Sequence, residues 1–148
     1  MNKIYYPYNE FKEDLIQLTQ QIDKEFDTIL PISRGGLSMG QMLGEYYNLR
    51  KVYAINTIGY EGSRKLEEVK VFNIPDLSDS KEVLIVDDII DSGDTLVEVL
   101  KILEKEYPAI TFYTASIFYK STAIIKPTWW VKEPNGWIEF FWSEDLKN

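Results

Sequence analysis

The sequence predicts an α/β domain with a mostly parallel sheet, and three observations support this fold class. The run 83–86 (VLIV) is continuously aliphatic, as in strands that are buried on both faces of a sheet. The segment 95–107 instead places its apolar residues at helical spacing. Such patterns alternate along the 148 residues, which indicates one domain with a twisted parallel sheet, flanking helices and right-handed crossovers.

The first half of the chain supplies two helices and two strands in this prediction. A helix is expected over 10–25, because apolar residues recur there every three or four positions after Asn9, the expected N-cap. The β-branched run 28–32 predicts a strand, and a helix over 37–47 is expected to pack beneath it. The segment 52–58 predicts the next strand.

The second half continues the alternation after a polar stretch. A polar loop is expected over 59–67, a short strand over 69–72 and a turn-rich connector over 73–81. The helix over 95–107 and a strand over 110–119 follow the aliphatic run. Neither an internal repeat nor a low-complexity segment interrupts this pattern.

The last segment, 126–148, is rich in aromatic residues and contains all four tryptophans of the chain. It is expected to form a small hood or flap beside the sheet. The prediction is therefore a single domain over residues 1–148.

The residue types that are absent limit the chemistry. The chain contains no cysteine and no histidine, so disulfides, thiolate nucleophiles, Cys/His zinc sites and imidazole bases are excluded. Proton transfer would fall to a carboxylate, a lysine, a tyrosine or water. A metal would be held by oxygen ligands, which favours Mg²⁺, Mn²⁺ or Ca²⁺.

The net charge of −8 argues against binding to a nucleic-acid backbone, which needs a basic face. No nucleic-acid partner is therefore expected, and a small anionic substrate would need local cations or backbone N–H groups. No apolar run reaches the roughly 18 residues of a membrane span, so stable membrane insertion is not expected. The N-terminus, MNKIYYPYNE, lacks the apolar stretch of a signal peptide, so the cytoplasm is the expected compartment.

The segment 83–96, VLIVDDIIDSGDTL, carries the most specific functional pattern. Asp87 and Asp88 come directly after the buried strand, where ligands bind in open parallel sheets. The loop 92–95 leads into a helix, and its backbone N–H groups and the helix N-terminus suit a phosphate. The two carboxylates can accept hydrogen bonds from ribose hydroxyls or hold a metal through water, although aspartates after a strand can also be structural caps.

This fourteen-residue pattern resembles the phosphoribosyl-diphosphate signature of the type I phosphoribosyltransferases. Further segments, within residues 28–142, resemble the bacterial xanthine-guanine phosphoribosyltransferases in particular. The segment 30–40, LPISRGGLSMG, is similar to the diphosphate-binding loop of that family, which contains a cis non-proline peptide bond. The resemblance implies that Ser33–Arg34 is this bond. It also implies that the diphosphate is bound by Ser33, Arg34, Gly35 and Gly36.

The resemblance implies the type I phosphoribosyltransferase fold and a defined reaction. The 5-phosphoribosyl group of phosphoribosyl diphosphate would pass to a 6-oxopurine (guanine, xanthine or hypoxanthine), giving a nucleoside monophosphate and diphosphate in purine salvage. Mg²⁺ is the implied cofactor, held by Asp87 and Asp88 mainly through water, and the same aspartates would bind the ribose hydroxyls. A homodimer or homotetramer is the implied assembly. The 5-phosphate would be bound by Ser92, Gly93, Asp94 and Thr95.

Other matched positions imply how the base is bound. Asp91 is the implied catalytic residue, a carboxylate that accepts a proton near N7 of the purine as N9 attacks the sugar. Lys120 stands where the family binds the exocyclic O6. The segment 136–142, GWIEFFW, is similar to the base-stacking segment of the family, so the hood over 126–148 would contribute to base binding. In that segment Trp137 would stack on the base, and the backbone at Ile138 would contact its far edge.

Two further expectations concern loops. Arg64 and Lys65 lie in the counterpart of a flexible loop that closes over the diphosphate in the family and shields the reaction from water. Asp94 departs from the family pattern, in which Gly or Lys is common. A carboxylate that pointed at a phosphate would repel it, so Asp94 is expected to point outward and to cap the following helix.

Three alternatives remain open at this point. The main one is a regulatory protein that retains the fold and senses phosphoribosyl diphosphate, although known examples bind nucleic acid through a basic face. A receiver-like signalling domain also has aspartates after a strand, but it would not account for the SRGG and SGDT segments. A transferase for a pyrimidine or adenine is disfavoured by Asp91, Lys120 and Trp137.

Overall fold

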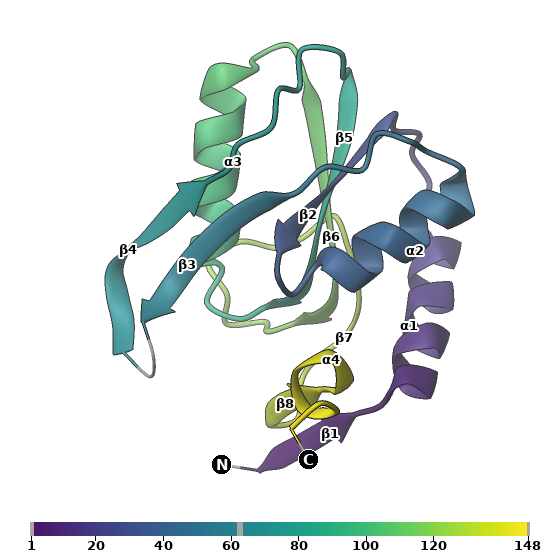
Figure 1. The fold of residues 1–148 in the computed structure, drawn as a ribbon, viewed down its shortest axis with the longest axis vertical. Coiled ribbons are helices and arrows are strands. Elements are labelled where there is room, and N and C mark those ends of the chain that lie inside the picture. Colours follow the sequence, from purple (N-terminus) through teal and green to yellow (C-terminus); the bar gives the residue numbers. More distant parts are fainter. Residues whose placement is uncertain (1, 62–63, 148) are drawn as a thin grey trace.

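The main sheet has six strands in the order β4-β3-β2-β5-β6-β7 (Figure 1). The computed structural model describes residues 2–61 and 64–147, and for residues 60, 61 and 64–67 it describes the backbone alone. All neighbouring strands are parallel except β3 and β4, so the predicted α/β fold with a mostly parallel sheet is confirmed. The strands are β2 (Thr28–Ser33), β3 (Ile55–Glu61), β4 (Arg64–Phe72), β5 (Glu82–Ile90), β6 (Thr111–Tyr119) and β7 (Trp129–Lys132).

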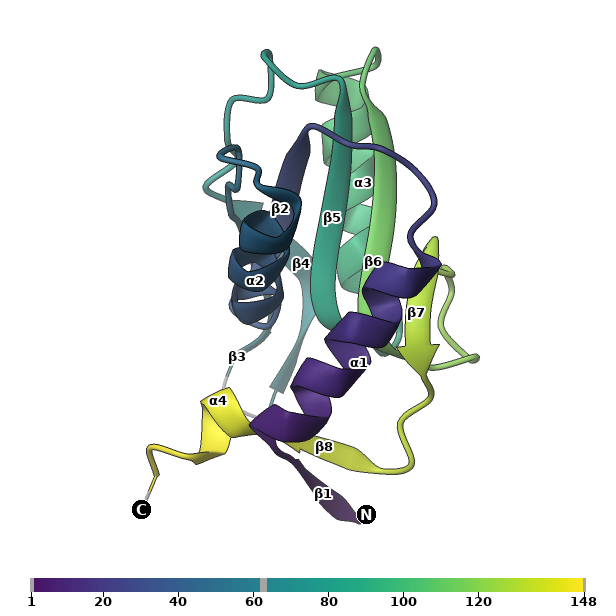
Figure 2. The ribbon, with the colours of Figure 1, turned by 90° about the vertical axis from the view of Figure 1, so that its right-hand side faces the viewer.

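Helices cover both faces of this sheet (Figure 2). α1 (Tyr8–Gln21) and α2 (Leu37–Tyr47) lie on one face, and α3 (Asp94–Glu106) lies on the other. The longest of them has 14 residues. Within the described part of the chain, no helix combines the length and the apolar character needed to cross a bilayer.

The side-chain alternation of β5 explains why both faces of the sheet are covered. Leu84 and Val86 belong to the core cluster under α1 and α2, whereas Val83 and Ile85 belong to the cluster under α3. All four side chains are at most 1% exposed. A strand that buries both faces has to be apolar at every position, which is the pattern that the sequence shows at 83–86.

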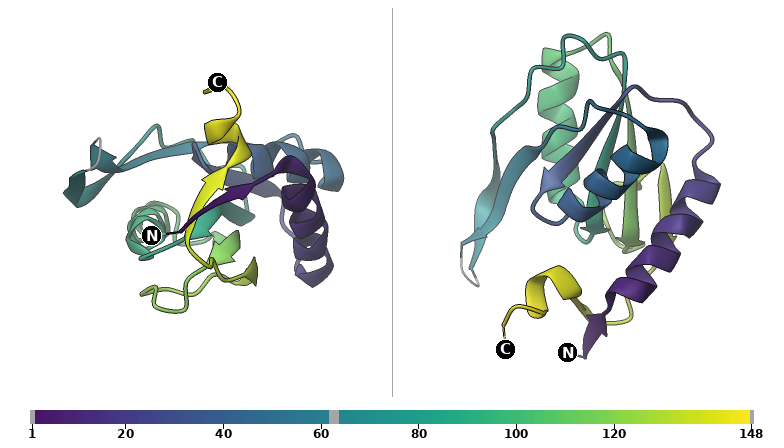
Figure 3. Two further views of the ribbon diagram at one scale, coloured as in Figure 1. Left: turned by 90° about the horizontal axis from the view of Figure 1, so that it is seen from below. Right: turned by 45° about the vertical axis from the view of Figure 1, so that its right-hand side comes forward.

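A second, two-stranded sheet was not predicted. β1 (Lys3–Tyr6) pairs in parallel with β8 (Trp137–Phe140), and α4 (Phe141–Glu144) follows directly. These three elements form the hood, at the lower end of the molecule in the right-hand view of Figure 3. Only part of 126–148 therefore belongs to the hood, because β7 extends the main sheet beside β6.

The start of α1 also differs from the prediction. The helix begins at Tyr8, so Asn9 lies in its first turn and is not the N-cap. Pro7 occupies the N-cap position with an extended backbone, and no side chain caps the helix. Proline is compatible with this place because its fixed φ suits the extended backbone of the N-cap residue. The helix ends at Gln21 rather than at residue 25.

The predicted polar loop over 59–67 is largely a β-hairpin. β3 continues to Glu61 and β4 begins at Arg64, with Tyr60 opposite Lys65 in an antiparallel register. Strands of an antiparallel pair need not be apolar at every position, since one face can be solvated. The polar composition of this segment therefore does not distinguish a loop from an exposed hairpin.

A partly buried polar network attaches the hood to the main sheet. The Tyr6 hydroxyl of β1 donates to Asp14 Oδ2 on α1 at 2.5 Å, and burial raises the pKa of Tyr6. Lys132 on β7 places its Nζ 2.8 Å from the same Asp14 oxygen and 2.9 Å from Glu10 Oε1. The Tyr6 ring packs edge-on against Phe140 of β8 at 5.6 Å. The position of β8 relative to the sheet is thus fixed by packing and by charge.

Candidate active site

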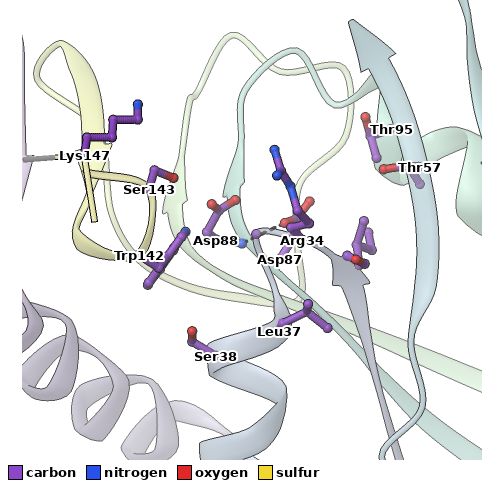
Figure 4. Close-up of a pocket in the computed structure, with 13 residues that line it drawn as sticks. Arg34, Leu37, Ser38, Thr57, Asp87, Asp88, Thr95, Trp142, Ser143 and Lys147 are labelled. Carbon is purple, nitrogen blue, oxygen red and sulfur yellow. Dashed lines mark hydrogen bonds between the residues drawn. The ribbon is translucent and has the colours of Figure 1, made fainter. Parts of the chain in front are cut away.

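Two pockets adjoin at the end of the sheet where β2 and β5 lead into α2 and α3. The larger, of about 800 Å³, is called the central pocket and is lined by Arg34, Asp87, Asp88 and Thr95 among others (Figure 4). The smaller, of about 470 Å³, is called the side pocket and lies under the hood. Ligands of open parallel sheets bind at this end, beyond the carboxyl ends of the strands.

The loop after β2 forms one wall of the central pocket. The Ser33–Arg34 peptide bond is cis, as the resemblance implied. A Cβ on Gly35 would lie 2.5 Å from Asp88 Oδ2, and a Cβ on Gly36 would lie 2.3 Å from the carbonyl oxygen of Val86. Gly36 therefore requires glycine, since it packs against the β5 backbone, whereas a side chain at position 35 would have to displace the Asp88 carboxylate. Of the four predicted loop residues, Gly36 alone is outside the pocket lining, at the N-cap of α2.

Asp87 and Asp88 face the central pocket from the end of β5. The Asp88 backbone N–H donates to Asp87 Oδ1 at 2.9 Å, and the Ile89 N–H donates to Asp88 Oδ1 at 2.7 Å. Burial raises the pKa of Asp87 well above its ordinary value, and the charge of Asp88 raises it further. Burial also raises the pKa of Asp88. Two adjacent carboxylates that resist ionisation form a site that would favour a bound cation.

We expect Asp87→Asn to stabilise the substrate-free protein near neutral pH, because asparagine does not carry the charge that burial and the neighbouring Asp88 disfavour. The pKa of Asp87 is higher in the folded protein than in the unfolded chain. Below the unfolded pKa the ionisation of Asp87 therefore costs the wild type no unfolding free energy. This cost appears as the pH rises toward the folded pKa, and it is fully present above it. Asn retains an acceptor for the Asp88 N–H.

Thermal midpoints of the wild type and Asp87→Asn, measured from acidic to mildly basic pH without ligand, test this expectation. The two midpoints should coincide in acid and separate as the pH rises. A variant that is less stable than the wild type at every pH would show that Asp87 has a structural role.

The loop 92–95 begins helix α3 at the rim of the central pocket. Gly93 is the N-cap residue, with φ +89°, a conformation that favours glycine. Asp94 is the first residue of the helix, so the expectation that it caps the helix is wrong. Its backbone N–H donates to Ser92 Oγ at 3.2 Å. Of the four predicted phosphate-loop residues, Thr95 lines the central pocket, and Figure 4 shows it beside Thr57 of β3.

The side pocket brings together the residues predicted for the base. Asp91, Lys120, Trp137 and Ile138 all line it, although they come from three separate segments. Lys120 Nζ lies 3.1 Å from Asp91 Oδ1, an ion pair in which both side chains are about half exposed. The Trp137 side chain is 58% exposed, so its ring is accessible for stacking. The ion pair was not expected, because each residue was assigned a separate contact.

The predicted flexible loop is only partly described. Gly62 and Ser63 lie outside the described residues, and so do the side chains of Arg64 and Lys65. The backbone places Arg64 at the start of β4, opposite Glu61. The contact of the Arg64 and Lys65 side chains with a diphosphate therefore stays a prediction.

Three residues near the C-terminus line the central pocket and were not predicted. Trp142, Ser143 and Lys147 lie along α4 and the segment after it, and Ser143 and Lys147 also line the side pocket. The Trp142 ring stacks on Phe140 with centroids 4.7 Å apart. The only sequence signal for these residues was a serine and a lysine that follow the aromatic segment 136–142. Their position at the pockets depends on the pairing of β1 with β8, which the sequence did not predict.

A cis-peptide loop, an aspartate pair and a glycine-initiated helix, gathered at one end of a mostly parallel sheet, define a type I phosphoribosyltransferase site. Residues 2–148 match the family model of the phosphoribosyl transferase domain, and the chain belongs to this family. It is therefore a phosphoribosyltransferase enzyme, and the resemblance to the xanthine-guanine enzymes is confirmed by individual relatives.

Three relatives each match 90% or more of the chain. The solved xanthine-guanine-hypoxanthine phosphoribosyltransferase of Helicobacter pylori is 37% identical, with a TM-score of 0.89 over 99% of this chain and 97% of that one. A Neisseria gonorrhoeae protein solved with bound ppGpp is 26% identical, with a TM-score of 0.78 over 99% and 91%. The xanthine-guanine phosphoribosyltransferase of Idiomarina loihiensis is 24% identical over 143 residues, which are 90% of this chain and 85% of that protein.

Proposed function

We propose that the protein transfers the 5-phosphoribosyl group of phosphoribosyl diphosphate to a 6-oxopurine, as a step of purine salvage. The observation that carries this proposal is the shared wall of the two pockets, since a sugar in the central pocket would present its C1 to a base in the side pocket. The bond from C1 to the diphosphate oxygen breaks, and a bond from C1 to purine N9 forms. The diphosphate leaves with the bonding electron pair.

In this proposal the central pocket holds the donor substrate. Arg34 and the backbone N–H groups of 33–36 bind the diphosphate, because a guanidinium and a glycine-rich loop both suit phosphate oxygens. Asp87 and Asp88 accept hydrogen bonds from the ribose hydroxyls. The loop 92–95 binds the 5-phosphate at the N-terminus of α3, where N–H groups and the helix dipole favour an anion. These contacts fix the sugar so that C1 faces the side pocket.

The donor atoms around the central pocket fit Mg²⁺. This ion is usually bound by one or two carboxylates together with substrate phosphates, and Asp87 and Asp88 supply two adjacent carboxylates whose pKa values are raised. Among the described residues no cluster of three or more acidic groups offers an all-protein site. When bound, the ion would supply electrostatic stabilisation of the charge that develops on the leaving diphosphate.

The ion pair in the side pocket matches one edge of a 6-oxopurine. N7 and O6 are neighbours on that edge, and Lys120 and Asp91 present a donor and an acceptor 3.1 Å apart. Lys120 would donate to O6, while Asp91 would accept a proton near N7 as N9 attacks. Adenine carries an amino group in place of O6, so it would face the lysine with a donor.

The hood supplies the remaining contacts to the base. Trp137 would stack on the ring, and the backbone at Ile138 would contact its far edge. Two of the relatives named above are phosphoribosyltransferases of xanthine and guanine, which supports a 6-oxopurine. The Neisseria gonorrhoeae relative was solved with ppGpp, a guanine nucleotide that carries diphosphates, and this supports the same ligand class.

A homodimer or homotetramer in the cytoplasm completes the proposal. The groove between α1 and α2 is lined mainly by apolar side chains, of which Ile16 and Tyr46 are 50% and 67% exposed. An apolar face of this kind is typical of contacts between subunits.

Turnover is expected to require a divalent cation, because two carboxylates and a diphosphate would otherwise meet in one pocket. Guanine consumption with phosphoribosyl diphosphate should stop in excess chelator and return when Mg²⁺ is added beyond the chelator. Full turnover in chelator would contradict the metal-assisted reaction. Tight binding of phosphoribosyl diphosphate without turnover of any base would instead favour the regulatory alternative.

A further inference from the structure

The segment from α4 onward places two polar side chains at the wall between the pockets. Ser143 and Lys147 line both the central and the side pocket. Figure 4 shows them on one side of Asp88, with Arg34 on the other side. If sugar and base occupy the two pockets, the shared wall lies close to C1 and to the diphosphate that leaves it. A cation at this wall is therefore near the bond that breaks.

This segment is held in place by contacts to the rest of the hood. The Tyr5 hydroxyl of β1 donates to Asp145 Oδ1 at 2.5 Å. The Asp145 N–H donates to the carbonyl of Phe141 at 2.9 Å, and the Lys147 N–H donates to that of Glu144 at 3.0 Å. The position of Lys147 beside the pockets thus follows from hydrogen bonds along the backbone and from β1.

The charges of the central pocket favour a second cationic side chain, besides Arg34, for binding the donor substrate. Its described lining contains two cations, Arg34 and Lys147, and two carboxylates, Asp87 and Asp88. Phosphoribosyl diphosphate brings a phosphate and a diphosphate into this pocket, in a chain whose net charge is already −8. Lys147 is therefore half of the described positive charge that the protein offers to the donor substrate.

We propose that Lys147 binds the diphosphate from the side opposite Arg34, assisted by the Ser143 hydroxyl, and stabilises its charge as it leaves. In the free enzyme Glu144 holds the ammonium group, with Lys147 Nζ 3.2 Å from Glu144 Oε2. When the substrate binds, the Lys147 ammonium group leaves the Glu144 carboxylate and contacts a diphosphate oxygen instead. The inference rests on the proposed function, because it assumes that a diphosphate occupies the central pocket.

Lys147→Met tests the inference, since methionine keeps most of the apolar stem and removes the charge. We expect the KM for phosphoribosyl diphosphate to rise about five- to tenfold and kcat to fall, with the KM for guanine and the thermal midpoint unchanged. The KM should also depend less on ionic strength than in the wild type. Lys147→Arg should restore most of the loss. Lys105→Met, at an exposed position in the last turn of α3, is the matched control and should match the wild type.

Glu144→Gln should act in the opposite direction. Without its resting partner, Lys147 is free for the substrate, so the KM for phosphoribosyl diphosphate should fall about two- to threefold. This gain should disappear in the double variant with Lys147→Met, which would demonstrate coupling between the two residues. A KM and a salt dependence equal to the wild type in Lys147→Met would overturn the inference.

Calorimetry with inorganic diphosphate and Mg²⁺ separates the inference from the proposed function. Weaker diphosphate binding by Lys147→Met, in a protein that turns over no purine, would support the inference and contradict the proposed function. Equal diphosphate binding by wild type and variant, in an enzyme that is active with guanine, would overturn the inference alone.

Discussion

Asp91→Asn is expected to lower kcat with guanine by about 10²–10⁴-fold, the usual contribution of a general base. Asp91 lines the side pocket and lies 3.1 Å from Lys120, so its carboxylate is on the base side of the site and not among the sugar contacts. Asn keeps the volume and one acceptor oxygen but cannot take up the proton. The KM for phosphoribosyl diphosphate should therefore change little. Steady-state kinetics with guanine, xanthine and hypoxanthine measure both quantities.

Two control variants make this result specific. Asp23→Asn removes an exposed carboxylate elsewhere on the surface and should leave kcat unchanged. Lys120→Met removes the partner of Asp91 and should weaken the preference for bases with an exocyclic oxygen, since O6 would lose its charged donor. If Asp91→Asn turns over all three bases at the wild-type rate, proton transfer goes to water or to another group, and the catalytic role of Asp91 is wrong.

Asp88→Ala is expected to lower kcat/KM for phosphoribosyl diphosphate by about 100-fold. Two charge-assisted hydrogen bonds to ribose hydroxyls at about 1.5 kcal/mol each correspond to roughly this factor. The fold should survive, because Asp88 is only half-buried and water can replace the acceptor for the Ile89 N–H. Removal of one carboxylate also relieves the repulsion that raises the pKa of Asp87.

In Asp88→Ala the binding of phosphoribosyl diphosphate should therefore weaken, while the thermal midpoint should stay close to that of the wild type. Calorimetry and thermal denaturation measure the two, and Asp23→Asn again serves as the carboxylate control. A variant that unfolds while Asp23→Asn stays folded would identify Asp88 as structural, and its assignment as a substrate ligand would then be wrong.

The main sheet was predictable because its signals are local. The VLIV run of β5 is apolar at each position since both faces are buried, and α3 has its apolar residues at helical spacing. The pairing of β1 with β8 joins residues 3–6 to 137–140, and each strand has only four residues with mixed polarity. No local pattern distinguishes such strands from loops, because tertiary contacts alone select them.

The same distinction holds for the candidate site. The Ser33–Arg34 loop and the Asp87–Asp88 pair belong to continuous motifs, so the sequence predicts both, and the structure places them in one pocket. Lys147 has no motif of its own, and its place beside the pockets results from the packing of the hood. The contact between Asp91 and Lys120 was missed for a related reason, since it depends on the parallel pairing of β5 with β6.

The choice of base tests the central claim most directly. The initial rate of the wild-type enzyme should be measured with phosphoribosyl diphosphate, Mg²⁺ and, in turn, guanine, xanthine, hypoxanthine, adenine and orotate. We expect turnover with at least one of the three 6-oxopurines and kcat/KM values at least about 100-fold lower for adenine and orotate. Adenine would face Lys120 with an amino donor, and orotate lacks the ring that carries N7 and N9. Turnover of adenine or orotate without turnover of any 6-oxopurine would contradict the account.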